Sequence, residues 1–189
     1  KELKGTVAVG HIRYSTTGVS LIRNAQPFLV RFKDMHIAVG HNGNLVNTLE
    51  LRRELENEGR IFQTTMDTEV FVHLIAKHMN GSTIEEAIRK ACARVQGSYS
   101  LLIMVNNKLI ALRDPHGIRP LVIGRLGDNY VFASETCAFD LIEAEYIRQV
   151  EPGEMIVVEG GRLTSHRLLD TAPKRQCIFE LIYFARPDS

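Results

Sequence analysis

The chain has 189 residues, 44% of them hydrophobic, which is enough to bury one substantial core and makes a single domain the default expectation. Its 23 lysines and arginines balance 22 aspartates and glutamates, no apolar run reaches the roughly 20 residues of a membrane-spanning helix, and no secretory signal opens the sequence. The balanced charge and the lack of a long apolar run favour a small molecule or another protein as the partner, with no nucleic acid and no membrane. The three cysteines are too far apart to suggest a disulfide framework, so we expect a cytoplasmic protein.

The N-terminal part combines an apolar run with polar residues. Residues 6–10 are apolar and small, which predicts a buried strand. Arg13 follows, and its guanidinium could bind a carboxylate through two parallel hydrogen bonds. A lone arginine at the end of a strand is more often a solvated surface charge. Thr16, Thr17 and Gly18 would add hydroxyl groups and a flexible backbone position beside it, so this stretch could line a polar pocket.

Two apolar runs, residues 26–32 and 35–40, flank Lys33-Asp34 and predict an antiparallel hairpin. The second run leads into residues 41–44, His-Asn-Gly-Asn, which we predict to be a turn because Asn-Gly readily supplies a positive φ. A plain hairpin turn is the commoner meaning of such a pair. The functional alternative is an oxyanion hole, which needs a side-chain amide such as that of Asn42 beside the outward backbone N–H of Gly43.

Three helices are predicted next. The first starts at Asn47 or Thr48 and stops at Gly59, the second opens within residues 64–69, and the third starts at the capping box of residues 82–85. Hairpins and short strands follow, separated by a rigid loop at 113–120 and a short helix after residue 136. The predicted strands are 99–105, 108–112, 121–124, 130–134, 146–150, 154–159, 162–166 and 177–184. This order indicates helices packed on a sheet.

Asp67 opens the second predicted helix. As a good helix-capping residue it needs no functional explanation. The alternative is that its carboxylate is the counter-charge for a ligand ammonium. Together with Arg13 it could then hold both ends of an α-amino acid, although spacing alone cannot bring the two loops together.

Three polar clusters occur in a fixed order, at residues 11–18, 36–47 and 65–69. They resemble the class II glutamine amidotransferase domain, a member of the N-terminal-nucleophile hydrolases. Two further stretches, 113–121 and 177–189, resemble the amidophosphoribosyltransferase branch of that family. The resemblance covers essentially the whole chain. The alternatives are another class II amidotransferase, or a non-catalytic module that binds an amino acid.

The resemblance implies an α+β fold, a four-layer α-β-β-α sandwich of mainly antiparallel sheets. It implies that residues 1–170 are a glutaminase domain truncated at its N-terminus. Residues 171–189 would be a linker and strand leading toward an absent phosphoribosyltransferase domain.

The resemblance also implies a mechanism. In the family, the thiolate of an N-terminal cysteine attacks the side-chain amide of L-glutamine, and its own α-amine moves the proton. Ammonia passes to the transferase domain, which makes phosphoribosylamine for de novo purine synthesis, and the glutamyl thioester is hydrolysed to glutamate. By matching motif, Asn42 and Gly43 would stabilise the oxyanion, Arg13 would bind the α-carboxylate and Asp67 the α-amine. Thr16 would line the pocket.

Because the sequence begins at Lys1, we expect a fragment that lacks the nucleophile and binds glutamine at best. No cofactor is expected in the fragment. The family uses Mg²⁺ in the transferase domain and, in some members, a [4Fe-4S] cluster, for which Cys177 lies where one ligand would be. One thiolate cannot hold a cluster that needs four, and a buried cysteine before a strand is the alternative. The full-length protein is expected to be a homo-oligomer.

Overall fold

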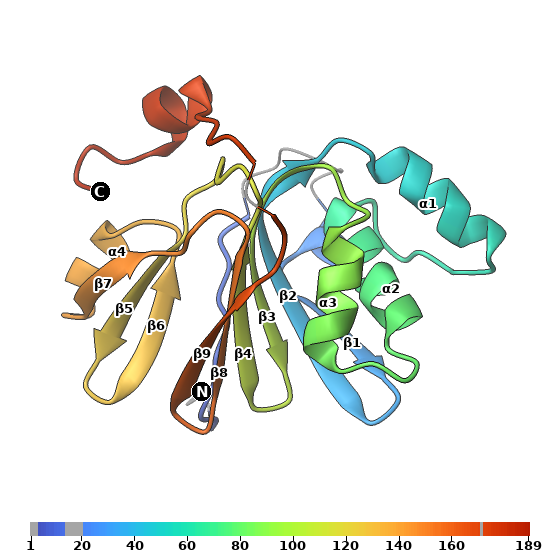
Figure 1. The fold of residues 1–189 in the computed structure, drawn as a ribbon, viewed down its shortest axis with the longest axis horizontal. Coiled ribbons are helices and arrows are strands. Elements are labelled where there is room, and N and C mark those ends of the chain that lie inside the picture. The colour runs from blue at the N-terminus through green and yellow to red at the C-terminus, as the bar shows by residue number, and fades with distance from the viewer. Residues whose placement is uncertain (1–3, 14–20, 171) are drawn as a thin grey trace.

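A computed structural model describes residues 4–13, 21–170 and 172–189 of the protein (Figure 1). Within these residues, nine strands form two sheets in which all neighbouring strands are antiparallel. The larger sheet has the order β1-β2-β3-β4-β8-β9 and consists of Phe28–Phe32, Met35–Leu45, Gly97–Val105, Lys108–Arg113, Glu154–Glu159 and Arg162–Arg167. The smaller has the order β6-β5-β7 and consists of Asn129–Ala133, Val122–Leu126 and Glu145–Gln149.

Helices cover one face of the larger sheet and the smaller sheet lies on the other side (Figure 1). The helices are α1 (Thr48–Asn57), α2 (Asp67–His78), α3 (Ile84–Cys92) and α4 (Cys137–Asp140), with a 3-10 turn at Ile22–Asn24 and a π-helical turn at Glu180–Phe184. None of the helices in the described part of the chain has the length and apolar character needed to cross a membrane.

Alternating side chains divide the core between the two faces of the larger sheet. On β4, Ile110 and Leu112 pack with α2 and α3, whereas Ala111 between them belongs to the cluster shared with the smaller sheet. On the smaller sheet, Ile123 joins that same cluster, while Gly124 meets Phe139 of α4 on the opposite face. The order of layers is therefore helices, sheet, sheet, helix, which matches the four-layer expectation.

The regular elements largely match the sequence pattern. Helix α1 buries Leu51 and Leu55, as the apolar spacing predicts. Helix α3 begins one residue later than the predicted capping box of residues 82–85 implies, because its N-cap is Thr83, whose side chain accepts a hydrogen bond from the N–H of Glu86 at 3.2 Å. The hairpin turns at residues 106–107 and 127–128 join strands that were predicted, 99–105 with 108–112 and 121–124 with 130–134. Local propensity and patterning were sufficient for these elements.

The predicted turn at residues 41–44 is wrong. Strand β2 continues to Leu45 and pairs with β3 through this stretch, with Asn42 opposite Ser100 and Gly43 opposite Tyr99. Gly43 makes the continuation possible, because it has a φ of +155° and because a Cβ there would overlap the carbonyl oxygen of Ser98. Asn42 and Gly43 are therefore held in a rigid ladder instead of a turn.

Three other predictions differ from the structure. Residues 6–10 form no strand, because apolar composition does not supply a hydrogen-bonded neighbour. Strand β7 pairs with β5 in the smaller sheet and not with β8, the next predicted strand along the sequence, because the turn at residues 152–153 moves the chain from one sheet to the other. Residues 177–184 form a helical turn, not a strand, and most of its apolar side chains are exposed while Glu180 is buried.

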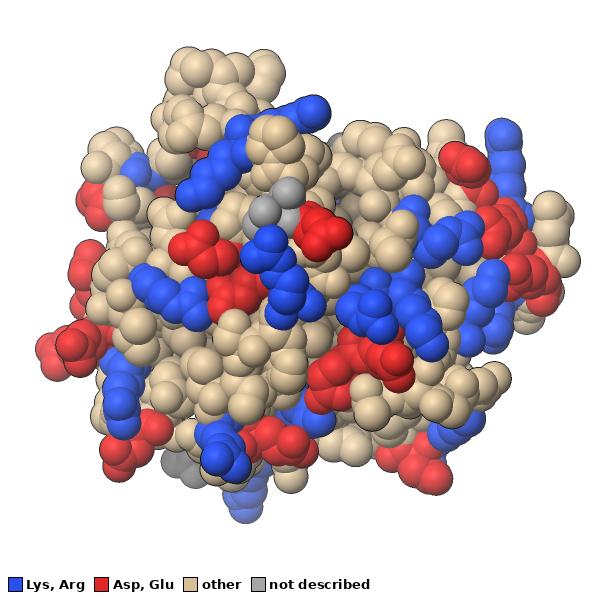
Figure 2. Space-filling view, in the orientation of Figure 1, with Lys and Arg blue, Asp and Glu red and all other residues tan. Residues whose placement is uncertain are grey.

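Charged side chains of both signs alternate over the face seen in Figure 2. Ion pairs among the described residues include Lys77 with Glu58 at 2.5 Å and Arg148 with Glu154 at 2.7 Å. This face therefore presents no broad field of one sign, in keeping with the near-zero net charge.

Candidate active site

A cavity of about 890 Å³ lies where the end of β2, the start of α2 and the smaller sheet meet. Its lining includes four of the predicted site residues, Arg13, Asn42, Gly43 and Asp67. The fifth, Thr16, lies outside the described residues. Three segments that are distant in the sequence thus contribute to one hollow.

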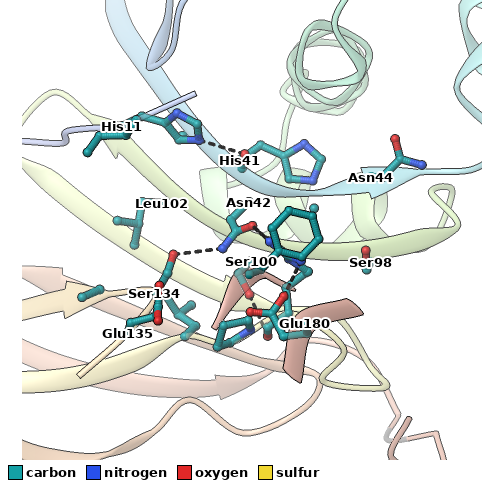
Figure 3. A pocket seen from close by; sticks show the side chains of 18 of the residues that line it. His11, His41, Asn42, Asn44, Ser98, Ser100, Leu102, Ser134, Glu135 and Glu180 are labelled. Atoms are coloured by element: carbon teal, nitrogen blue, oxygen red, sulfur yellow. Dashed lines mark hydrogen bonds and ion pairs between the residues drawn. The ribbon is translucent and has the colours of Figure 1, made fainter. Parts of the chain in front are cut away.

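The side-chain amide of Asn42 is held at both ends (Figure 3). Its Oδ1 accepts hydrogen bonds from Arg119 Nε at 2.9 Å and Nη2 at 2.6 Å. Its Nδ2 donates to the hydroxyl oxygen of Ser134 at 3.0 Å. Because a guanidinium can only donate, these contacts determine which end of the amide is the oxygen.

Asp67 is buried at the first turn of α2, with 5% of its surface exposed. Its Oδ2 accepts from the N–H of Leu45 at 3.1 Å, and its Oδ1 lies 3.3 Å from His41 Nδ1. Burial alone would raise the pKa of Asp67, but the hydrogen bond and charge of His41 and the backbone N–H groups outweigh it and hold this pKa below its usual value. The carboxylate is therefore ionised at neutral pH.

The loop before α2 is shaped by buried polar contacts. The carboxylate of Glu69 accepts from the N–H groups of Gln63 and Thr64, both at 2.7 Å, and from the Thr64 hydroxyl at 2.7 Å. Asn24 donates to the hydroxyl of Thr65 at 3.0 Å. These bonds fix the backbone that presents Asp67 to the cavity.

Two histidines connect the N-terminal segment with β2. His11 Nε2 lies 3.0 Å from the carbonyl oxygen of His41, and both residues line the cavity (Figure 3). Burial is the largest influence on His11 and lowers its pKa, so the ring is neutral at pH 7 and can donate to that carbonyl. The contact ties the segment that carries Arg13 to the strand that carries Asn42.

The lowered pKa of Asp67 predicts how the stability of the fold depends on pH. The pKa of Asp67 is lower in the folded protein than the value of about 3.9 in the unfolded chain, so the ionised carboxylate stabilises the fold at any pH above the unfolded pKa. This stabilisation is lost as the pH falls through the pKa of the folded protein. The stability deficit of Asp67→Asn relative to the parent should therefore be largest near pH 7 and should shrink below about pH 4. Urea unfolding of both proteins across this range measures it. The exposed Asp34→Asn is the control, and a deficit independent of pH would contradict the prediction.

The three cysteines differ in their surroundings. Cys92 is buried in the core, and burial raises the pKa of its thiol to about 12, which makes it a poor nucleophile. Cys137 and Cys177 both line the cavity. Among residues 4–13, 21–170 and 172–189, no three His, Cys, Asp or Glu side chains gather into a metal-binding group. The role of Cys177 as a cluster ligand stays a prediction.

Sequence reasoning missed the residues that support Asn42. Arg119 was assigned to a rigid loop, and Ser134 to the end of a predicted strand, yet both bond the Asn42 amide. Glu180 was placed in a strand, but it pairs with Arg119 beside the cavity. The resemblance of stretches 113–121 and 177–189 to one branch of a family was the available signal, but it did not indicate these contacts.

Comparison with known proteins identifies the class that this fold and cavity define. Residues 11–140 match the family described as a glutamine amidotransferase domain. Because the match spans more than half of the chain, the protein belongs to this family.

Within the family, the chain is similar to amidophosphoribosyltransferases. It is 49% identical to amidophosphoribosyltransferase 2, chloroplastic, of Arabidopsis thaliana, over 100% of this chain and 34% of that relative. It is 46% identical to amidophosphoribosyltransferase of Bacillus subtilis, over 100% of this chain and 40% of that relative. The solved structure of glutamine phosphoribosylpyrophosphate amidotransferase from B. subtilis, complexed with ADP and GMP, matches with a TM-score of 0.87 and 45% identity, over 94% of this chain and 38% of that one.

These comparisons confirm the expected fold of the N-terminal-nucleophile hydrolases and the resemblance to the amidophosphoribosyltransferase branch. The chain spans less than half of the length of the relatives named above.

Proposed function

We propose that this domain binds L-glutamine and hydrolyses its side-chain amide to glutamate and ammonia, as the glutaminase half of an amidophosphoribosyltransferase. The observation that carries the proposal is the single cavity lined by Arg13, Asn42, Gly43 and Asp67. A guanidinium complements the α-carboxylate of glutamine, a carboxylate complements its α-ammonium, and an amide beside a backbone N–H complements its side-chain amide.

Two of these residues would orient the substrate. The guanidinium of Arg13 would bind the α-carboxylate of glutamine, and the ionised carboxylate of Asp67 would bind its α-ammonium. Opposite charges in the lining of one cavity distinguish an α-amino acid from a simple carboxamide. They would leave the side-chain amide of the substrate at the position of Asn42 and Gly43.

Asn42 and Gly43 would stabilise the charge that develops during the reaction. When a thiolate adds to the carboxamide carbon, the C=O electron pair moves onto oxygen. One N–H of the Asn42 amide donates to Ser134, which leaves the second available for that oxygen. The N–H of Gly43 would be the other donor, and removal of one such donor typically costs about 3 kcal/mol of transition-state stabilisation.

The proposed nucleophile is a cysteine with a free α-amine, as the resemblance implies. The amine takes the thiol proton and delivers it to the departing nitrogen, so that the C–N bond breaks and ammonia leaves. Water then hydrolyses the glutamyl thioester to glutamate. Cys92, Cys137 and Cys177 are all internal residues without such an amine, and we assign the role to none of them.

We propose that the whole polypeptide also contains a phosphoribosyltransferase domain. Ammonia from this domain would there displace pyrophosphate from phosphoribosylpyrophosphate and form phosphoribosylamine. The phosphoribosyltransferase step is supported by the names of the relatives and by the resemblance of stretches 113–121 and 177–189. Assembly into a homo-oligomer rests on that resemblance alone.

The proposal is tested by measuring glutamate and ammonia released by the full-length polypeptide. L-glutamine should be hydrolysed and L-asparagine should not, because its shorter side chain cannot reach Asn42 while its α-groups are held by Arg13 and Asp67. Arg13→Gln should raise KM for glutamine by about tenfold or more, since it removes a charge-assisted pair. Equal rates with both amides would overturn the binding roles, and binding of glutamine without hydrolysis would favour a non-catalytic amino-acid-binding module.

A further inference from the structure

Arg119 contacts the proposed oxyanion-hole amide from a distant part of the chain. It lies in the loop between β4 and β5, 77 residues after Asn42 in the sequence. Both its Nε and its Nη2 donate to Asn42 Oδ1, at 2.9 and 2.6 Å. Two donors from one rigid planar group hold the amide more firmly than a single hydrogen bond can.

The backbone of Arg119 is itself fixed. Its carbonyl oxygen accepts from Ser100 Oγ at 3.1 Å and from Arg113 Nε at 2.7 Å. Arg113 is buried and also donates to the carbonyl oxygens of Gly117 and Val150, at 2.8 and 2.9 Å. The loop that carries Arg119 is therefore attached to both sheets.

The guanidinium of Arg119 is also held on its other side. Its Nη1 pairs with the carboxylate of the buried residue Glu180, and the Arg119 Cζ atom lies 4.7 Å from the centroid of the Phe184 ring. Both residues belong to the π-helical turn near the end of the chain, which also lines the cavity. A desolvated ion pair with a ring contact leaves the guanidinium little freedom to turn away from Asn42.

An asparagine amide has two ends of similar shape and opposite polarity. If Asn42 turned over, its oxygen would face the place where the oxyanion forms and would repel it. Arg119 prevents this, because its donors can bond only Oδ1 and thereby direct Nδ2 to the opposite side. Ser134 accepts one of the two Nδ2 hydrogens, so the amide plane is set by partners at both of its ends.

We propose that Arg119 is the positioning residue that orients the Asn42 amide toward the reacting oxygen, and that Glu180 supports it from the C-terminal turn. This inference rests on the proposed function, in which Asn42 is an oxyanion donor. Arg119 does not touch the substrate in this arrangement. It acts only through Asn42.

The test is a double-mutant cycle in the full-length polypeptide, with glutaminase kcat and KM as readouts. Arg119→Lys is the main variant, because lysine keeps the charge that pairs with Glu180 but lacks the two-donor fork. It should lower kcat by about tenfold with KM within about twofold, and in an Asn42→Ala background it should cause no further loss. Glu180→Gln should lower kcat by a smaller factor, and this loss should also vanish in the Asn42→Ala background.

Arg94→Lys is the matched control, because Arg94 forms an ion pair with Glu54 at 2.6 Å outside the cavity lining. If Asn42→Ala itself leaves kcat unchanged, the proposed oxyanion role fails. If Asn42→Ala lowers kcat but Arg119→Lys does not, the inference about Arg119 is overturned while the oxyanion role of Asn42 stands. The same conclusion follows if the losses in kcat of the two single variants multiply in the double variant. Should Arg119→Lys fail to fold, the cycle of Glu180→Gln with Asn42→Ala gives the same decision.

Discussion

Asn42→Ala in the full-length polypeptide is expected to lower kcat for glutamine hydrolysis about 10²- to 10³-fold, while KM changes by less than about threefold. The amide N–H is aimed at a charge that exists only after the nucleophile has added, so its loss weakens binding of the transition state and not of glutamine. Steady-state assays of glutamate release measure both constants.

Asn57→Ala is the matched control for this experiment. Asn57 is an exposed asparagine at the end of α1, and it does not line the cavity. Its replacement should leave kcat and KM unchanged. If Asn42→Ala instead raised KM and left kcat near the parent value, Asn42 would be a ground-state binding residue, and the oxyanion assignment would be wrong.

Asp67→Asn should weaken glutamine binding by about 30-fold or more, because it removes one partner of a buried charge pair, a change that typically costs about 2–5 kcal/mol. The side chain of Asp67 is 7% exposed, so little solvent is present to screen its interaction with the α-ammonium. Calorimetric titration of L-glutamine and the KM of the assay both report the effect. Circular dichroism of each variant establishes that it is folded.

A substrate analogue separates the charge of Asp67 from its structural contacts. Asp67 also accepts a hydrogen bond from Leu45 and contacts His41, so its replacement could disturb β2. If the loss comes from the α-ammonium, the parent and Asp67→Asn should bind glutamine that lacks its α-amine with nearly equal affinity. An equally large loss with this analogue would show that Asp67 acts through the strand, and Asp34→Asn serves as the control for charge alone.

Periodicity and turn residues were enough to predict most of the helices and strands, whereas the four-layer arrangement was implied by the resemblance to a family. The stripe of Val70, Phe71, Leu74 and Ile75 occurs at helical spacing, and α2 buries all four. The predictions failed where a distant partner decided the outcome. Asn42-Gly43 has the composition of a turn, but pairing with residues 98–100 of β3 keeps it in the ladder, and Gly43 adopts its positive φ of +155° within the strand.

The sequence predicted part of the chemistry of the candidate site. Arg13, Asn42 and Asp67 could be selected from residue type and from the resemblance to a family. Their presence in one cavity, and the buried surroundings that keep Asp67 ionised, come from the structure. Spacing along the chain carries no information about how loops on different elements converge.

The sequence by itself determined the class of fold, the order of helices and hairpins, and the residue types of an amino-acid pocket, because these depend on local patterns and on motifs within short stretches. Only the tertiary structure decided which end of the Asn42 amide faces the cavity. That choice depends on Arg119, 77 residues away, and on Glu180 in the C-terminal turn. The orientation of a side-chain amide is set by its hydrogen-bond partners in space, and those partners become neighbours only when the sheets and the C-terminal turn have come together.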